Sequence, residues 1–168
     1  MSSTEERVAA LEGLVAAQQE RLRQMEDQQA IAQLIASYGP LVDAGEADRV
    51  AALWTEDGSY DVEDWHMADR AAVAAMVRSD AHQGLISRGS AHFLGPAHVS
   101  VDGDTAVAVC ESVLVVQQER HPVVARIAAN LFELARTPEG WRITRRTTRG
   151  LRGTREAHDL LAGRVPTD

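Results

Sequence analysis

The hydrophobic period of this chain changes once, near Ser90, and that change most limits what the chain can fold into. Before it, apolar residues follow a helical spacing, as in the face made by Ile31, Leu34, Ile35 and Tyr38. After it, long alternating runs are separated by turn sequences such as VDGDT and TPEG, which indicates adjacent antiparallel strands. Helices followed by a strand meander predict an α+β domain whose curved sheet wraps around helices and encloses a cavity.

A proline divides the helical part of the chain. Pro40 removes a helical hydrogen bond, so we expect the helix over residues 31–43 to kink or end there, which re-aims Asp43. The other elements expected before the sheet are a helix over 46–54, a strand over 59–64 and a helix over 69–85. A short helix within 153–163 is expected to close the chain.

The N-terminal segment predicts a separate helix. At 168 residues the chain suits one domain, and we divide it into a helix over 1–28, the domain over 29–163 and a tail over 164–168. The helix lies either on its own domain or on another subunit. Its narrow apolar stripe favours the second, and hence a homo-oligomer. The stripe consists of Val8, Leu11, Val15, Leu22 and Met25.

Composition narrows the function classes. The 17 basic residues against 25 acidic ones argue against binding to nucleic-acid phosphates. No basic leader precedes an apolar core, and no apolar run is long enough to span a membrane, so we expect a cytoplasmic protein with no membrane contact. The single Cys110 excludes an internal disulfide and a cysteine-rich metal site.

The remaining motifs indicate no metal and no cofactor. The histidines show neither an HxxxH nor an HxH spacing, and no GxSxG, P-loop or GxGxxG motif occurs. His66 is placed where it could reach a pocket mouth. The other histidines outside the candidate site are expected on the surface or in loops, namely His82, His98, His121 and His158.

Three segments between residues 28 and 152 resemble the SnoaL-like family of the nuclear-transport-factor-2-like superfamily, in its scytalone dehydratase and hexachlorocyclohexane dehydrochlorinase branch. They are QAIAQLIASYGPLVDAGEADRVAALWTEDGSYDV, GSAHFLGPAHVSVDGDTAVAV and RIAANLFELARTPEGWRITRRTTR. The resemblance implies a cone-shaped α+β barrel with a deep hydrophobic pocket, often dimeric or trimeric. The functions it implies range from lyases and isomerases to binding-only subunits.

The resemblance places an acid/base pair at Asp43 and His92, where that branch carries an aspartate and a histidine. The two residues stand 49 positions apart, so only the fold can join them. Imidazole can take a proton near neutral pH, and a carboxylate fixes its tautomer and stabilises the cation. The alternative is that Asp43 caps its helix and His92 is a packed strand residue.

Aromatic residues complete the implied pocket. Tyr60 matches a substrate-positioning tyrosine, whereas Val42 stands where the branch has a second one, which argues against scytalone as the substrate. Tyr38 can supply a hydroxyl instead or belong to the core. Trp54 is either pocket wall or packing.

Three polar residues on the long strands are further candidates for contacting substrate. Alternation sets Arg126 and Asn130 on one strand face, where they can hold or orient an oxygen. The alternative pairs Arg126 with Glu111 and turns Asn130 toward a subunit interface. Arg146, predicted to share a face with Arg142, is the third candidate.

We therefore predict a cofactor-independent acid/base enzyme, of dehydratase, dehydrohalogenase or isomerase type, acting on a small, largely apolar molecule through the Asp43–His92 pair. The alternative is a non-catalytic protein of the same fold, which binds a small molecule or serves as an accessory subunit.

Overall fold

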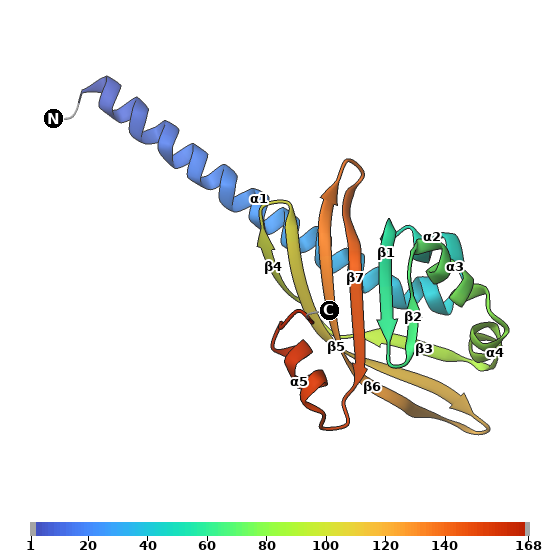
Figure 1. Ribbon diagram of the computed structural model, residues 1–168. Helices are drawn as coiled ribbons and strands as arrows, with labels where there is room; N and C mark the ends of the chain where they lie inside the picture. The colour runs from blue at the N-terminus through green and yellow to red at the C-terminus, as the bar shows by residue number, and fades with distance from the viewer. Residues whose placement is uncertain (1–2, 167–168) are drawn as a thin grey trace.

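A curved sheet of seven strands organises the protein (Figure 1), and the computed structural model describes residues 3–166 of it. The helices are α1 (Thr4–Asp43), α2 (Ala47–Ala51), α3 (Arg70–Arg78), α4 (Asp80–Arg88) and α5 (Arg155–Leu161). The strands are β1 (Trp54–Val62), β2 (Trp65–Met67), β3 (Ser90–Leu94), β4 (His98–Asp102), β5 (Thr105–Gln118), β6 (His121–Thr137) and β7 (Gly140–Gly150). The predicted α+β class is confirmed.

The sheet is mixed rather than wholly antiparallel. Its order is β2-β1-β7-β6-β5-β3, and β4 pairs with the other half of the long strand β5. The meander from β5 to β7 is antiparallel, as predicted, but β1 runs parallel to β7. A parallel pair needs a long crossover, and here the chain between β1 and β7 includes α3, α4 and the whole meander. Turn signals identify hairpins and cannot reveal such a distant pairing.

The first helix is continuous. It runs through Pro40 to Asp43, so of the two outcomes predicted at the proline, a kink or an end, the helix does not end there. The predicted boundary between residues 28 and 29 falls inside this helix. The proline deprives only the Ala36 carbonyl of its helical donor, and Ala36 is exposed to water, which can replace it. Gly45, at a φ of 72°, turns the chain after the helix. The predicted tail over 164–168 lies partly outside the described residues.

Two shorter elements also differ from the predicted ones. Trp54 begins β1 instead of ending a helix, because α2 already ends at Ala51. The helix predicted over 69–85 is two helices, α3 and α4. Ser79 separates them because its backbone is extended and its hydroxyl accepts a hydrogen bond from the His82 N–H, which starts α4.

The two faces of the sheet have different coverings. On the concave face, Phe132 and Leu134 of β6 join the core with Ile31 and Ile35 from the second half of α1. On the other face, α5 packs on residues such as Leu131 (Figure 1). Strand alternation explains the division, because neighbouring β6 residues point to opposite sides. No helix in the described residues is long and apolar enough to cross a membrane.

Candidate functional site

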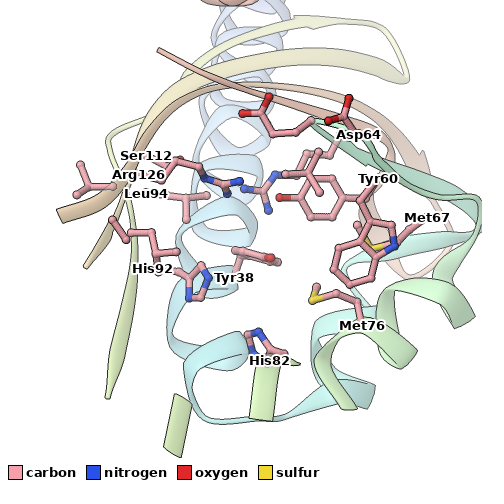
Figure 2. A pocket seen from close by; sticks show the side chains of 17 residues that line it. Tyr38, Tyr60, Asp64, Met67, Met76, His82, His92, Leu94, Ser112 and Arg126 are labelled. Atoms are coloured by element: carbon pink, nitrogen blue, oxygen red, sulfur yellow. The ribbon is translucent and has the colours of Figure 1, made fainter. Parts of the chain in front are cut away.

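A pocket of about 640 Å³ opens on the concave side of the sheet (Figure 2). Five of its lining residues come from five different elements: Tyr38 from α1, Tyr60 from β1, His92 from β3, Arg126 from β6 and Arg146 from β7. All five were predicted from the sequence as site residues, and the structure brings them to one cavity.

Asp43 and His92 meet at the edge of this pocket. The His92 Nδ1 lies 2.7 Å from Asp43 Oδ1, and the His92 backbone N–H donates to Asp43 Oδ2 at 2.6 Å. The Ser90 hydroxyl donates to Asp43 Oδ1 at 2.9 Å. The carboxylate at the end of α1 is therefore held by β3, and its bonds are not those of a helix cap. Sequence reasoning did not identify Ser90, whose contribution depends on the α1–β3 packing.

The contact with Asp43 determines the tautomer of His92. Because the carboxylate can only accept, Nδ1 carries the proton and Nε2 of the neutral ring is left as a base. Burial lowers the pKa of His92, while the hydrogen bond to Asp43 opposes that shift, and the nearby His82 and Arg146 also lower it. The imidazole is accordingly neutral at pH 7 and able to take up a proton.

His82 was wrongly predicted to be a surface or loop residue. It is 7% exposed, lines the pocket, and lies with its ring centroid 5.8 Å from that of His92. Its Nε2 lies 2.9 Å from the Val42 carbonyl, which makes Nε2 the donor. The Ser79 cap that starts α4 was the available signal for a separate helix. The side chain is buried only by the tertiary position of α4, which packs on α3, β3 and β5.

Of the two alternatives for Trp54, pocket wall or packing, the structure shows packing, because Trp54 does not line the pocket. It is fully buried, and its indole N–H donates to the Ser59 carbonyl at 3.1 Å. Its ring stands 6.0 Å from Tyr38 and 5.9 Å from Tyr60, so it supports the two tyrosines from behind. Burial raises the pKa of Tyr38, which keeps that hydroxyl protonated.

Arg146 is held between aromatic rings. Its guanidinium carbon lies 4.3 Å from the Tyr38 ring centroid, 4.5 Å from that of Tyr60 and 5.0 Å from that of Phe132. The prediction that it shares a face with Arg142 was wrong. The β6–β7 register shifts between Glu133 and Leu134, which adds one residue on β7 and reverses the alternation there.

Asn130 lies beneath the pocket and does not line it. It is fully buried, which contradicts a position at a subunit interface. Its Oδ1 accepts from Arg146 Nη2 at 2.8 Å and from the Thr148 hydroxyl at 2.8 Å, and its Nδ2 donates to the Ser112 hydroxyl at 2.9 Å. Asn130 thus positions Arg146, whereas the sequence suggested direct contact with a substrate.

Arg126 faces the cavity without a partner of its own. Glu111, the alternative partner, stands opposite Ala129 in the β5–β6 register, and Arg126 stands opposite Leu114. Within residues 3–166 Arg126 forms no hydrogen bond or ion pair. A register shift beside Leu114 lets both Ala125 and Arg126 line the pocket. Over the same residues, no group of three or more His, Cys, Asp or Glu side chains could hold a metal ion.

Fold and site together define a pocketed α+β protein of the nuclear-transport-factor-2-like type. A structure of such a protein from Novosphingobium aromaticivorans, with a cystatin-like fold, is 45% identical to this chain. The match covers 84% of this chain and 93% of that one, with a TM-score of 0.83. The SnoaL-like domain model matches residues 23–147, so the chain belongs to the SnoaL-like domain family.

More distant structures share the fold. One assigned provisionally as an aromatic ring hydroxylase is 25% identical, with a TM-score of 0.60 over 76% of this chain and 90% of that one. One assigned provisionally as a scytalone dehydratase is 17% identical, with a TM-score of 0.65 over 76% of this chain and 85% of that one. Both come from Novosphingobium aromaticivorans. No curated protein matches the chain.

Proposed function

We propose that this protein is a cofactor-independent lyase or isomerase, of dehydratase, dehydrohalogenase or isomerase type, acting on a small, largely apolar molecule. The observation that carries the proposal is the 2.7 Å contact between Asp43 and His92 at the wall of a pocket of about 640 Å³. It leaves a neutral imidazole with a free Nε2 inside a cavity of suitable size for one small molecule.

The proposed step begins with proton transfer from substrate carbon to His92. Nε2 takes a proton from the carbon next to a carbonyl, and the electrons of the C–H bond form an enolate. The enolate then either expels a leaving group from the neighbouring carbon or, where a double bond is conjugated to it, is protonated at the far end of that double bond. Asp43 stabilises the imidazolium while it exists, and His92 returns the proton to the product or leaving group.

The opposite wall of the pocket supports this chemistry. Arg146 and Tyr60 line the same cavity as His92, so a cation and a phenol are available to stabilise a developing enolate oxygen. Asn130 holds the guanidinium in place through its 2.8 Å contact. Groups held in advance by the fold stabilise charge without reorganising during the reaction.

Proton abstraction can be tested without knowing the natural leaving group. The probe is 2-tetralone, an apolar ketone with acidic protons beside its carbonyl, and NMR in D2O follows deuterium uptake at that carbon. We expect the protein to accelerate uptake over buffer and His92→Ala to remove most of the acceleration, by about 100-fold or more. His98→Ala is the matched control, because His98 is exposed on β4.

Two results would contradict the proposal. One is a folded His92→Ala variant that exchanges deuterium as fast as the unaltered protein. The other is tight binding of 2-tetralone with no acceleration by the unaltered protein. The second result would favour the alternative, a binding or accessory protein that uses the same pocket without chemistry.

A further inference from the structure

We infer that the pocket binds a small carboxylate with an apolar body, and that Arg146 and Arg126 hold its anionic oxygens. This inference rests on the proposed function for the pocket itself, and it adds the class of molecule that fits there. The guanidinium groups that face the cavity indicate this class of molecule.

Arg146 is a buried cation without an anionic partner. The residue is 2% exposed, and only its Nη2 has a hydrogen bond, to the neutral amide of Asn130. In the described part of the chain, Nε and Nη1 are both buried and unpaired. Aromatic rings offset part of the desolvation cost, but buried donors left unpaired remain costly. An oxygen anion in the pocket would supply the missing acceptors.

A second guanidinium lines the same cavity. Arg126 has neither a hydrogen-bond nor an ion-pair partner in residues 3–166, and Figure 2 shows its side chain extending into the pocket. Glu63 and Asp64 also line the cavity, from the turn between β1 and β2. Glu63 accepts a hydrogen bond from the Gly150 N–H at 2.7 Å, and neither acid forms an ion pair with Arg146 or Arg126. Neither guanidinium is therefore directly paired with these carboxylates.

The rest of the lining indicates the body of the ligand. Val62, Met67, Met76 and Leu94 present apolar surface to the cavity. A ligand that satisfies both parts of the wall needs one anionic group and an apolar remainder. His92 is close enough for Arg146 to lower its pKa, so the anion site and the base belong to one pocket.

Calorimetry with benzoate and benzamide tests this inference, because the two probes share a shape and differ in charge. We expect the protein to bind benzoate at least about tenfold more tightly than benzamide at pH 7, as charge-assisted hydrogen bonds are worth about 1.5–3 kcal/mol. In Arg146→Met the ratio of the benzoate affinity to the benzamide affinity should fall to about one. In Arg126→Met this ratio should fall in part. His92→Ala should retain the preference.

Equal binding of the two probes by the unaltered protein would overturn the inference, as would an unchanged preference in a folded Arg146→Met variant. If Arg146→Met does not fold, the outcome for Arg126→Met and the preference of the unaltered protein still decide. Failure of the catalytic proposal would appear separately, as deuterium uptake independent of His92 with the benzoate preference intact.

A different observation, in the N-terminal half of α1, carries a second inference. Residues 3–26 are all exposed, and Figure 1 shows this part of the helix projecting beyond the sheet. Its large apolar side chains are between 47% and 62% exposed. So much exposed apolar surface on one helix marks an interaction site. These side chains are Val8, Leu11, Leu14, Val15, Leu22 and Met25.

Five of these six residues form a heptad seam. The a positions are Val8, Val15 and Leu22, and the d positions are Leu11, Gln18 and Met25. At about 100° per residue, the seam lies roughly 160° around the helix from the face that packs on the sheet. A partner can therefore reach the seam without colliding with the protein's own domain.

We propose that the seam pairs with the same segment of a second copy, in a parallel, in-register dimer. A parallel coil sets each g residue against the e residue five positions later in the partner. Arg7 then faces Glu12 of the second copy, and Arg21 faces Glu26. Antiparallel pairing would place acids opposite acids and arginines opposite arginines. Valine at two of the three a positions, with Leu11 at the first d position, favours two strands.

Disulfide cross-linking tests both the pairing and its direction. In Leu11→Cys the new thiols of a parallel dimer lie opposite one another, so oxidation should yield a covalent dimer on a non-reducing gel. Glu20→Cys, on the outer f position, is the control, and the native Cys110 is buried. Light scattering should show a dimer for the unaltered protein and a monomer for Val15→Glu/Leu22→Glu.

Charge exchange provides an independent measurement. Arg7→Glu/Arg21→Glu should weaken the dimer, and the further changes Glu12→Arg/Glu26→Arg should restore it. A monomeric unaltered protein, a dimer that survives Val15→Glu/Leu22→Glu, or equal cross-linking of Leu11→Cys and Glu20→Cys would each overturn the proposal.

Discussion

The two halves of α1 belong to one continuous helix, yet they have opposite surroundings. From residue 3 to 26 every side chain is exposed, whereas the second half buries Ile31, Ile35, Tyr38 and Val42 against the sheet. The first half begins with a capping box between Ser3 and Glu6. Local signals therefore build a helix throughout, and contact with the sheet makes only its second half part of the pocket.

Asp27 marks the boundary between the halves. Arg136 donates two hydrogen bonds to its carboxylate, each at 2.7 Å, and the Trp141 indole N–H donates a third at 2.9 Å. These contacts tie the helix to β6 and β7 at the point where it leaves the sheet. Burial of the helix therefore begins at one polar anchor, Asp27, and not at a change of secondary structure.

The largest expected effect comes from the last residue of the helix. Asp43→Asn keeps the size of the side chain but removes the charge that holds His92, so 2-tetralone exchange should fall by about 100- to 10,000-fold. NMR in D2O measures the rate. Glu20→Gln, in the projecting half, should leave the exchange rate unchanged. An equal loss of rate in both variants would mean that the two halves of α1 do not differ in their effect on the pocket.

Core truncation tests the packing difference directly. Ile35 is 1% exposed, so Ile35→Ala should lower the free energy of unfolding by about 2–5 kcal/mol. Leu14 is 62% exposed, and Leu14→Ala should stay within about 0.5 kcal/mol. Urea denaturation gives both values. Similar losses at the two sites would mean that the projecting half also has a packed environment in solution.

Loss of the Asp27 charge should have a smaller, pH-dependent effect on the free energy of unfolding. Asp27→Asn should lower the free energy of unfolding by about 1–2 kcal/mol at pH 7, because Arg136 is partly exposed. The hydrogen bond from Arg136 lowers the pKa of Asp27 below its usual 3.8. Its stabilisation is therefore present above that value and is lost as pH falls through the folded-state pKa. Denaturation at pH 7 and pH 3 should show the difference from the Asp27→Asn variant shrinking at the lower pH.

The smallest effect is expected in the projecting half. Gly13 has open space where a Cβ would lie, so Gly13→Ala should stabilise the helix by about 1 kcal/mol. Amide hydrogen exchange should then slow by about fivefold around that position. Unchanged exchange there, with a stable fold elsewhere, would contradict the expected stabilisation of the helix by the added Cβ.

The sequence predicted most of the residues at the site, but it did not show which of them line the pocket and which lie beneath it. Asp43 and His92 stand 49 residues apart, and the family resemblance placed them together. Alternation located Asn130 on the pocket side of β6. It could not show whether the side chain lines the pocket or holds another residue that does. The same reasoning misplaced Arg146 relative to Arg142, because a single extra residue on β7 reverses a strand's faces.

The α+β class, the strand meander and the helical character of α1 follow from the sequence alone. These depend on period, capping and turn chemistry within short stretches of chain. Only the tertiary structure decided that Pro40 stays within the helix, that His82 lies beside His92, and that Arg146 is buried without an anion. Those outcomes depend on contacts between distant segments, where burial and charge act on groups that no local pattern connects.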